Sequence, residues 1–257
     1  MEIHWHPKIK RHLGTIKEYL LELILIFTAI SLGYLAENSR ENYLHSKNEK
    51  ELIANILKEL KDDEIIYNKN IDNLEFQRFG LDTILHLLQS NMSKSVQKKL
   101  SYYLCLYTLE SELRTSPNNR SLNHLIYSGG YFNIEKIQVA NKVESYYNYF
   151  IKNMDDSYYR YLKSHENVIQ NSIELVSMNK CQPLLQKMEK SINWNFNSTI
   201  DSLPELRCSN NEVIENTYNR VYLLKLAITD YISWVSTTKT YARYLYNEIQ
   251  KEYDTAL

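Results

Sequence analysis

The sequence predicts an all-α protein in which one N-terminal transmembrane helix continues into an antiparallel bundle of long helices. Three observations predict it. Only five Gly and four Pro occur among 257 residues, whereas strand-rich folds draw on these residues for their many turns. One stretch of about eighteen residues near the N-terminus is almost uncharged. Apolar residues then recur every three or four positions along most of the remaining chain, which is the spacing of packed helices.

The chain divides by pattern into a short basic tail (1–18), a transmembrane helix (19–36) and a helical-bundle domain (37–257). At 1.5 Å per residue, 19–36 spans about 27 Å, close to the hydrocarbon thickness of a bilayer. A buried core helix and a cleaved signal peptide are the alternatives. The segment shows no polar stripe and no small-x-small pair at its exit, and these features argue against both. We therefore expect an uncleaved anchor whose first partner is the lipid bilayer.

Basic residues flank this segment unevenly. Four precede it and three follow closely: Lys8, Lys10, Arg11 and Lys17, then Arg40, Lys47 and Lys50. By the positive-inside rule the N-terminus is predicted to lie in the cytoplasm and the main domain on the other side. The three cysteines show no CxxC spacing, so neither a zinc site nor a disulfide framework is indicated. Cys105 is interpreted as a small buried residue, and the spacing leaves open whether Cys181 and Cys208 pair.

One face of the transmembrane segment gathers small residues. Spacings of four and three residues place five side chains on one narrow stripe: Glu22, Ile26, Ala29, Gly33 and Ala36. Small residues allow two helices to approach closely in a membrane. The stripe is predicted to bind another helix, from a second copy of the chain or from another membrane protein. In the alternative interpretation, Glu22 lies among the headgroups beside Lys17 and has no special role.

A 3-4 apolar repeat resumes beyond the membrane, with an average spacing of 3.5 residues, and Glu64 and Arg78 interrupt it. Its members are Ile53, Leu57, Leu60, Tyr67, Ile71, Leu74, Leu81, Leu85 and Leu88. Gly80 is expected to break or bend this helix near its far end. Further helices are predicted over 93–113, 120–127, 134–178 and 212–253, with an irregular crossing over 179–211.

Few polar residues stand out in this domain. Gly129 and Gly130 form the only Gly pair in the chain, and Gly alone enters positive-φ conformations at low cost. They are predicted to form a turn that folds one helix back on the next, with a ligand-contacting loop as the alternative. The Asp62-Asp63-Glu64 run is interpreted as a solvated helix face. His86 and His165 are interpreted as packed core histidines.

Charge and motifs exclude several classes of function. The formal net charge is -1, from 30 basic and 31 acidic residues, so nothing indicates nucleic-acid binding. No catalytic, nucleotide-binding or metal-binding motif occurs. We expect no enzyme activity, cofactor, metal or small-molecule substrate, and instead a membrane protein whose helical domain mediates protein–protein interaction or self-association. The alternative is a membrane-linked sensor or effector, in stress or phage defence, that signals through its single transmembrane helix.

Two stretches carry a resemblance to a known family. They are EYLLELILIFTAISLGYLAENSREN with the following EKELIANILKELKDD, and PNNRSLNHLIYSGGYFNIEKIQVANKVESYYNYF. Together they resemble DUF6090, a family of uncharacterised single-pass proteins common in Bacteroidota. The second stretch is similar in its turn and its paired tyrosines, here Leu125, Ser128, Gly129, Tyr146 and Tyr147.

The sequence departs from that family pattern at two positions. Ser39 stands where the family usually has Trp, and Gly130 stands where Asn is frequent. The resemblance covers about the first 150 residues. It implies a membrane location and a bacterial source, and it brings no known activity or catalytic residue. Combined with the positive-inside rule, this gives a bacterial inner-membrane protein with its main domain in the periplasm.

Overall fold

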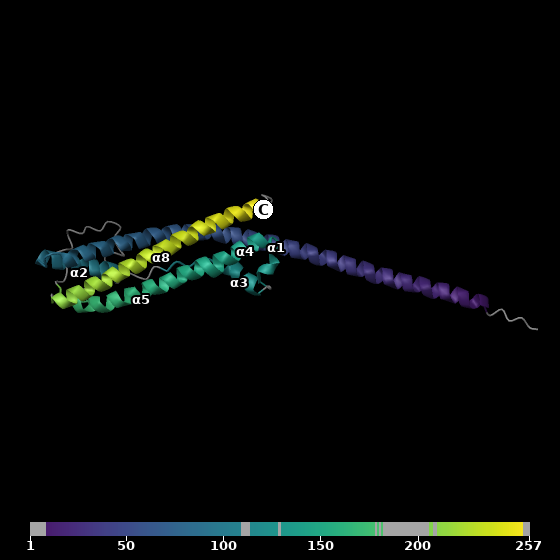
Figure 1. Cartoon of the computed structure of the whole chain (residues 1–257), viewed down its shortest axis with the longest axis horizontal. Helices are drawn as coiled ribbons and strands as arrows, with labels where there is room; N and C mark the ends of the chain where they lie inside the picture. The colour runs from purple at the N-terminus through teal and green to yellow at the C-terminus, as the bar shows by residue number, and fades with distance from the viewer. Residues whose placement is uncertain are drawn as a thin grey trace, which may run out of the picture. The chain divides into compact units, whose positions relative to one another are not determined.

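The computed structural model describes residues 9–108, 114–127, 130–177, 179, 181, 206, 207 and 210–253. The side chains of 9–15, 108 and 132 lie outside that description. Every regular element in the described residues is helical, so the predicted all-α class is confirmed (Figure 1). The elements are α1 (Ile9–Gln89), α2 (Lys94–Thr108), α3 (Arg120–Tyr127), the 3-10 turn η1 (Gly130–Asn133), α4 (Ile137–Ser145), the π-helix η2 (Tyr146–Ile151), α5 (Lys152–Leu175) and α8 (Asn211–Glu252).

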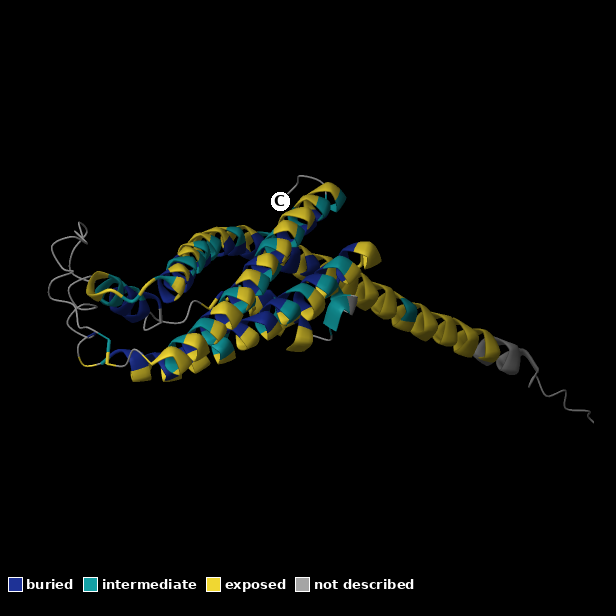
Figure 2. Cartoon of the chain, turned by 60° about the vertical axis from the view of Figure 1, so that its left-hand side comes forward, coloured by how far each residue is buried: buried dark blue, intermediate teal, exposed yellow. Residues whose placement is uncertain are grey.

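The chain forms two compact units, residues 1–53 and residues 54–257, and the boundary between them falls within α1. In the first unit, the apolar side chains along 16–36 are almost all exposed (Figure 2). A core helix of a soluble protein buries most of its apolar side chains, whereas none of this apolar window is buried within the chain. The second unit holds the helical bundle and its hydrophobic core.

Within residues 54–257, contacts between side chains fix the directions of the helices. Three pairs join α1 to α8, and the residue numbers rise on one helix as they fall on the other: Asp82–Lys225, Asn68–Lys239 and Glu64–Arg243. The α5–α8 pairs behave in the same way, as Ser157–Asp230 and Asn167–Arg220 show. α8 therefore runs antiparallel to both α1 and α5, as the sequence predicted.

The predicted repeat on α1 faces the core. Every seventh residue from Leu60 is buried: Leu60, Tyr67, Leu74, Leu81 and Leu88. This spacing matches the near-heptad period of packed helices. The repeat is thus confirmed as the inner seam of the bundle, although Leu57 and Ile71 are only half-buried.

α1 does not break at Gly80, because the helix continues through it to Gln89. A Cβ at Gly80 would lie 2.3 Å from Cε1 of Tyr107 on α2. The missing side chain makes room for this ring, so Gly80 serves the packing of two helices.

The helix boundaries agree closely with the sequence at some elements. The short helix is found at Arg120–Tyr127, as predicted, and α8 begins one residue before the predicted start. The predicted helix over 134–178 is a succession of α4, η2 and α5, with a π-helical turn in its middle. Residues 109–113 and most of 179–211 lie outside the described residues.

Candidate functional site

The five residues of the predicted association face lie on α1 and are all exposed: Glu22, Ile26, Ala29, Gly33 and Ala36. Nothing in the structure lies within 4 Å of the place where a Cβ of Gly33 would stand. α1 is long and apolar enough to cross a membrane, and none of its apolar window is buried. This face is therefore open to contacts with lipid or with another helix.

Of the predicted turn residues, Gly129 lies outside the described residues. Gly130 has a φ of +86°, in the left-handed region, and opens η1. A side chain is strained in this conformation, whereas Gly adopts it at little cost. No neighbouring atom lies within 4 Å of its Cβ position, so backbone conformation rather than crowding favours Gly here.

The most developed polar arrangement in the described part of residues 54–257 is an acid–tyrosine cluster. It consists of Glu59, Asp63 and Tyr67 on α1 with Tyr146 and Tyr147 on η2. Spacing of four residues places the three α1 side chains on one face of that helix. All five side chains are buried. The two tyrosines are consecutive in the chain, and the π-helical turn holds both against α1. Such turns recur at functional sites.

Asp63 occupies the centre of this cluster, so its interpretation as part of a solvated face is wrong. Its side chain is fully buried. The Tyr146 hydroxyl donates to Oδ2 and the Asn118 backbone N–H donates to Oδ1, both at 2.8 Å. The Tyr146 hydroxyl hydrogen is used in the bond to Asp63. The Tyr67 hydroxyl, whose oxygen is 2.8 Å from that of Tyr146, is therefore the donor to Tyr146. These bonds provide the partners that a buried carboxyl needs.

Glu59, one turn earlier on α1, has a similar environment. The Ser121 backbone N–H donates to Oε1 at 3.0 Å, and the Tyr147 hydroxyl donates to Oε2 at 3.2 Å. Each carboxyl thus accepts one tyrosine hydroxyl and one backbone N–H. Both N–H groups belong to the chain between α2 and the first turn of α3.

Burial sets the protonation of this cluster. It raises the pKa of Asp63 to about 6, against the hydrogen bonds from Asn118 and Tyr146, which lower it. Burial likewise raises the pKa of Glu59, partly offset by its bonds from Ser121 and Tyr147. The pKa values of Tyr67, Tyr146 and Tyr147 are raised by burial, so these phenols stay protonated as donors. The cluster therefore contains a carboxyl that changes charge close to neutral pH.

A row of polar residues on α1 is the signal in the sequence that predicts this burial. Asp63, Asn70 and Gln77 recur every seven residues, in register with Ile56 and Ile84. Asn70 donates to the Thr115 hydroxyl at 3.1 Å, and Gln77 accepts from the Tyr161 hydroxyl at 3.0 Å. The period of seven shows that Asp63 belongs to the seam, whereas the neighbouring Asp62 is exposed.

A disulfide joins Cys105 on α2 to Cys181, and both residues are buried. Cys105 is therefore buried, as predicted, but it is bonded to a second cysteine, which the sequence did not predict. Cys208 lies outside the described residues, and the bond to Cys105 leaves Cys181 no thiol with which to pair with it. The two bonded residues are 76 positions apart. Sequence spacing alone does not reveal such a pair, because the bundle brings the two segments together.

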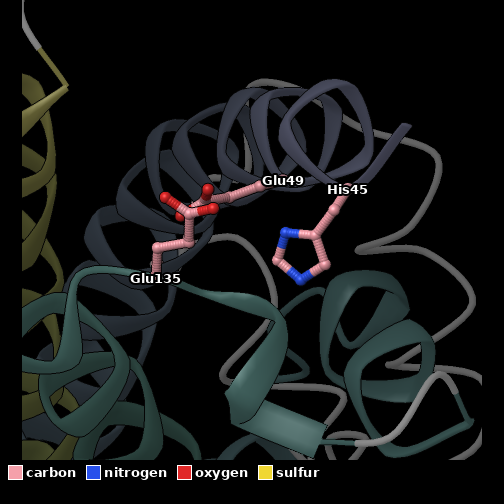
Figure 3. A group of neighbouring side chains, drawn as sticks. All are labelled: His45, Glu49 and Glu135. Carbon is pink, nitrogen blue, oxygen red and sulfur yellow. The ribbon is translucent and has the colours of Figure 1, made fainter. Parts of the chain in front are cut away.

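Three of the described histidines, His45, His86 and His165, lie in different surroundings. His45 and Glu49 lie one turn apart on α1 (Figure 3). His165 is buried in the bundle, as predicted, beside the ring of Tyr161. His86 is exposed at the end of α1, so its assignment to the core is wrong.

Comparison with known proteins adds no assignment. No family model, no curated protein and no solved structure matches this chain.

Proposed function

We propose that this chain is a single-pass membrane protein whose helical domain acts through protein–protein contacts on the periplasmic side. The observation that carries the proposal is the exposure of the apolar 16–36 part of α1. Phe27 is 72% exposed and Leu23 is 67% exposed. Apolar surface of this extent needs a cover, and a bilayer supplies one over the length of the segment.

The Cys105–Cys181 disulfide supports the periplasmic side. Disulfides persist in oxidising compartments such as the periplasm and are rare in the cytoplasm. The bond lies within the 54–257 unit. With an anchor at 19–36, a periplasmic domain would put the N-terminus in the cytoplasm, and the excess of basic residues before the segment supports that orientation.

Exposed aromatic side chains support a role in protein contacts. In the 54–257 unit, Phe76, Phe79 and Tyr127 are 57%, 69% and 88% exposed. Aromatic residues are enriched at protein interfaces and often carry much of the binding energy. On the anchor, the stripe that includes Gly33 offers a second contact, to a copy of this chain or to another membrane protein.

The anchor is tested by membrane fractionation of the full-length protein. Ile24→Arg with Ile30→Arg is expected to move the protein to the soluble fraction, since each Arg costs about 3 kcal/mol at the centre of a transmembrane helix. The matched control is Leu223→Arg with Leu226→Arg, two exposed positions on α8. It is expected to stay in the membrane. If the two double variants divide between the membrane and soluble fractions in the same way, the anchor is contradicted.

The side of the membrane is tested with protease added to intact spheroplasts. We expect digestion of the 54–257 unit while a cytoplasmic marker protein stays whole. A domain that becomes sensitive only after lysis would overturn the periplasmic assignment.

Association is tested by chemical crosslinking in membranes and in mild detergent. Gly33→Ile is expected to abolish the crosslinked species, because a large side chain blocks close approach of the helices. Leu32→Ile, one residue off the stripe, is the control and should leave the species intact. If the wild-type protein is a lone monomer under all these conditions, the interaction role is wrong.

A sensor function is the second candidate, and one observation favours it. The acid–tyrosine cluster includes three residues of α1, the same helix that carries the apolar segment. A structural change at the cluster would therefore act on the same helix that continues into the apolar segment. This class predicts that overexpression permeabilises the membrane to a dye, and that Asp63→Asn alters the effect while Asp62→Asn does not.

A further inference from the structure

The segment from Thr115 to Ser121, in the first turn of α3, is held in place by side chains of other helices. Three of its backbone N–H groups, spaced three residues apart, donate to side chains on α8 and α1. Thr115 donates to the Tyr231 hydroxyl at 2.8 Å, Asn118 donates to Asp63, and Ser121 donates to Glu59. Thr115 and Ser121 are buried. Residues 114–119 have no helix to satisfy their backbone, so their seating depends on these acceptors.

We propose that Glu59 and Asp63 form a pH-sensitive latch, which seats residues 114–121 on α1 when the carboxyls are protonated and releases them as the carboxyls ionise. The latch lies within the 54–257 unit, and it does not depend on the membrane or interaction role. It gives this unit a way to respond to the pH of its compartment.

The direction of the response follows from opposing effects at the two carboxyls. Ionised Asp63 and Glu59 accept stronger hydrogen bonds than the neutral acids do. Against this, each charge is buried, and the two lie one turn apart on the same helix, where they repel one another. The raised pKa values show that burial prevails at both groups. Lifting the 114–121 segment would expose both carboxylates to water, so ionisation favours the open form.

The surrounding charges do not reverse this direction. Glu59 and Asp62 raise the pKa of Asp63, and Arg120, at the start of α3, is the cation facing Glu59. The other titratable groups that act on the cluster are Tyr67, Tyr131, Tyr146, Tyr147, Asp155 and Tyr231. Arg114 is the cation beside Asp155 and Tyr231. No cation among these groups forms a hydrogen bond with Asp63.

Linkage gives the size of the effect. A carboxyl with a pKa of about 6 in the closed form and about 4 in the open form changes the opening equilibrium about tenfold between about pH 5 and about pH 7.5. Local openings of this kind are measured by amide hydrogen exchange.

The experiment is hydrogen exchange on the full-length protein in detergent micelles, read by mass spectrometry on peptides covering 114–121 and corrected for intrinsic exchange. We expect wild-type protection to be about tenfold greater at about pH 5 than at about pH 7.5. Asp63→Asn should remove most of this difference. Asp62→Asn makes the same replacement at the exposed neighbouring residue, and this variant should keep the difference in protection. Unchanged wild-type protection, or equal loss in both variants, would overturn the latch.

A second variant keeps the test decisive if Asp63→Asn fails to fold. Glu59→Gln removes a negative charge that raises the pKa of Asp63. The midpoint of the protection change is therefore expected to move to lower pH. A midpoint that stays in place or moves upward would overturn the coupling of the two carboxyls.

Discussion

Several residues on the inner face of α1 are unfavourable for an isolated helix and depend on partners from other elements. Gly80 weakens a helix by about 1 kcal/mol relative to Ala, and the Tyr107 ring fills the space that its missing side chain leaves. Asp63 and Glu59 are carboxyls in a buried seam, and hydroxyl and backbone donors surround them. These residues make the packing of α1 specific to its neighbours.

Gly80→Ala tests the contact with Tyr107. The new methyl group would collide with the ring, and we expect the free energy of unfolding to fall by about 1–3 kcal/mol, as for other overpacked sites. In a Tyr107→Ala background the collision is gone. There the same substitution should raise stability by about 1 kcal/mol through helix propensity. Urea unfolding followed by circular dichroism measures both, and an equal effect in the two backgrounds would contradict the contact.

The buried carboxyl also predicts how global stability depends on pH. The folded-state pKa of Asp63, about 6, lies above its ordinary value of 3.8. Between these values the folded protein holds a proton that the unfolded chain has released, so stability falls as pH rises. The loss from Asp63 is at most about 3 kcal/mol between about pH 4 and about pH 7. Unfolding measured across this range should show a slope that Asp63→Asn reduces, whereas Asp62→Asn should preserve it.

At the scale of elements, patterns along the sequence predicted the helix periods and helix bounds, because these features depend on residues close together in the chain. The period of α1, the bounds of α3 and the stripe on α8 follow from spacing and end signals alone. The sequence did not predict the features that depend on contacts between distant elements. The Gly80–Tyr107 contact joins two helices, and the burial of Asp63 relies on Asn118 and Tyr146, 55 and 83 residues away. The period of seven shared by Asp63, Asn70 and Gln77 is a sequence signal for the polar layer that the prediction did not use.

The disulfide is the strongest link between distant elements. It ties α2 to Cys181, beyond the end of α5, across 76 residues. In the chain-entropy treatment a closure of this length stabilises the folded state by about 4 kcal/mol. Reduction, or Cys105→Ala with Cys181→Ala, is expected to lower the free energy of unfolding by a similar amount.

The measurement for the disulfide combines urea unfolding with mobility on non-reducing gels. Wild type and Cys208→Ala should both run faster without reductant, while the double variant should not change. A mobility shift that depends on Cys208 would show a different pairing.

For the whole molecule, the two units have opposite surface character. The apolar segment of residues 1–53 is exposed along its length, whereas residues 54–257 bury a continuous seam of apolar and tyrosine side chains. A unit with its own core is able to fold without the rest of the chain.

Residues 54–257, exported to an oxidising compartment without the first unit, are therefore expected to be soluble without detergent. They should be highly helical by circular dichroism and should unfold cooperatively, because nearly all of the buried core and the Cys105–Cys181 bond lie inside this fragment. The full chain should instead require detergent, since residues 19–36 keep their apolar surface. The matched control is the same fragment with Leu81→Asp, which places a charge in the buried seam and should abolish cooperative unfolding. If the fragment aggregates, residues 54–257 also expose a large apolar surface. If the full chain stays soluble without detergent, the apolar surface of 19–36 is covered by protein.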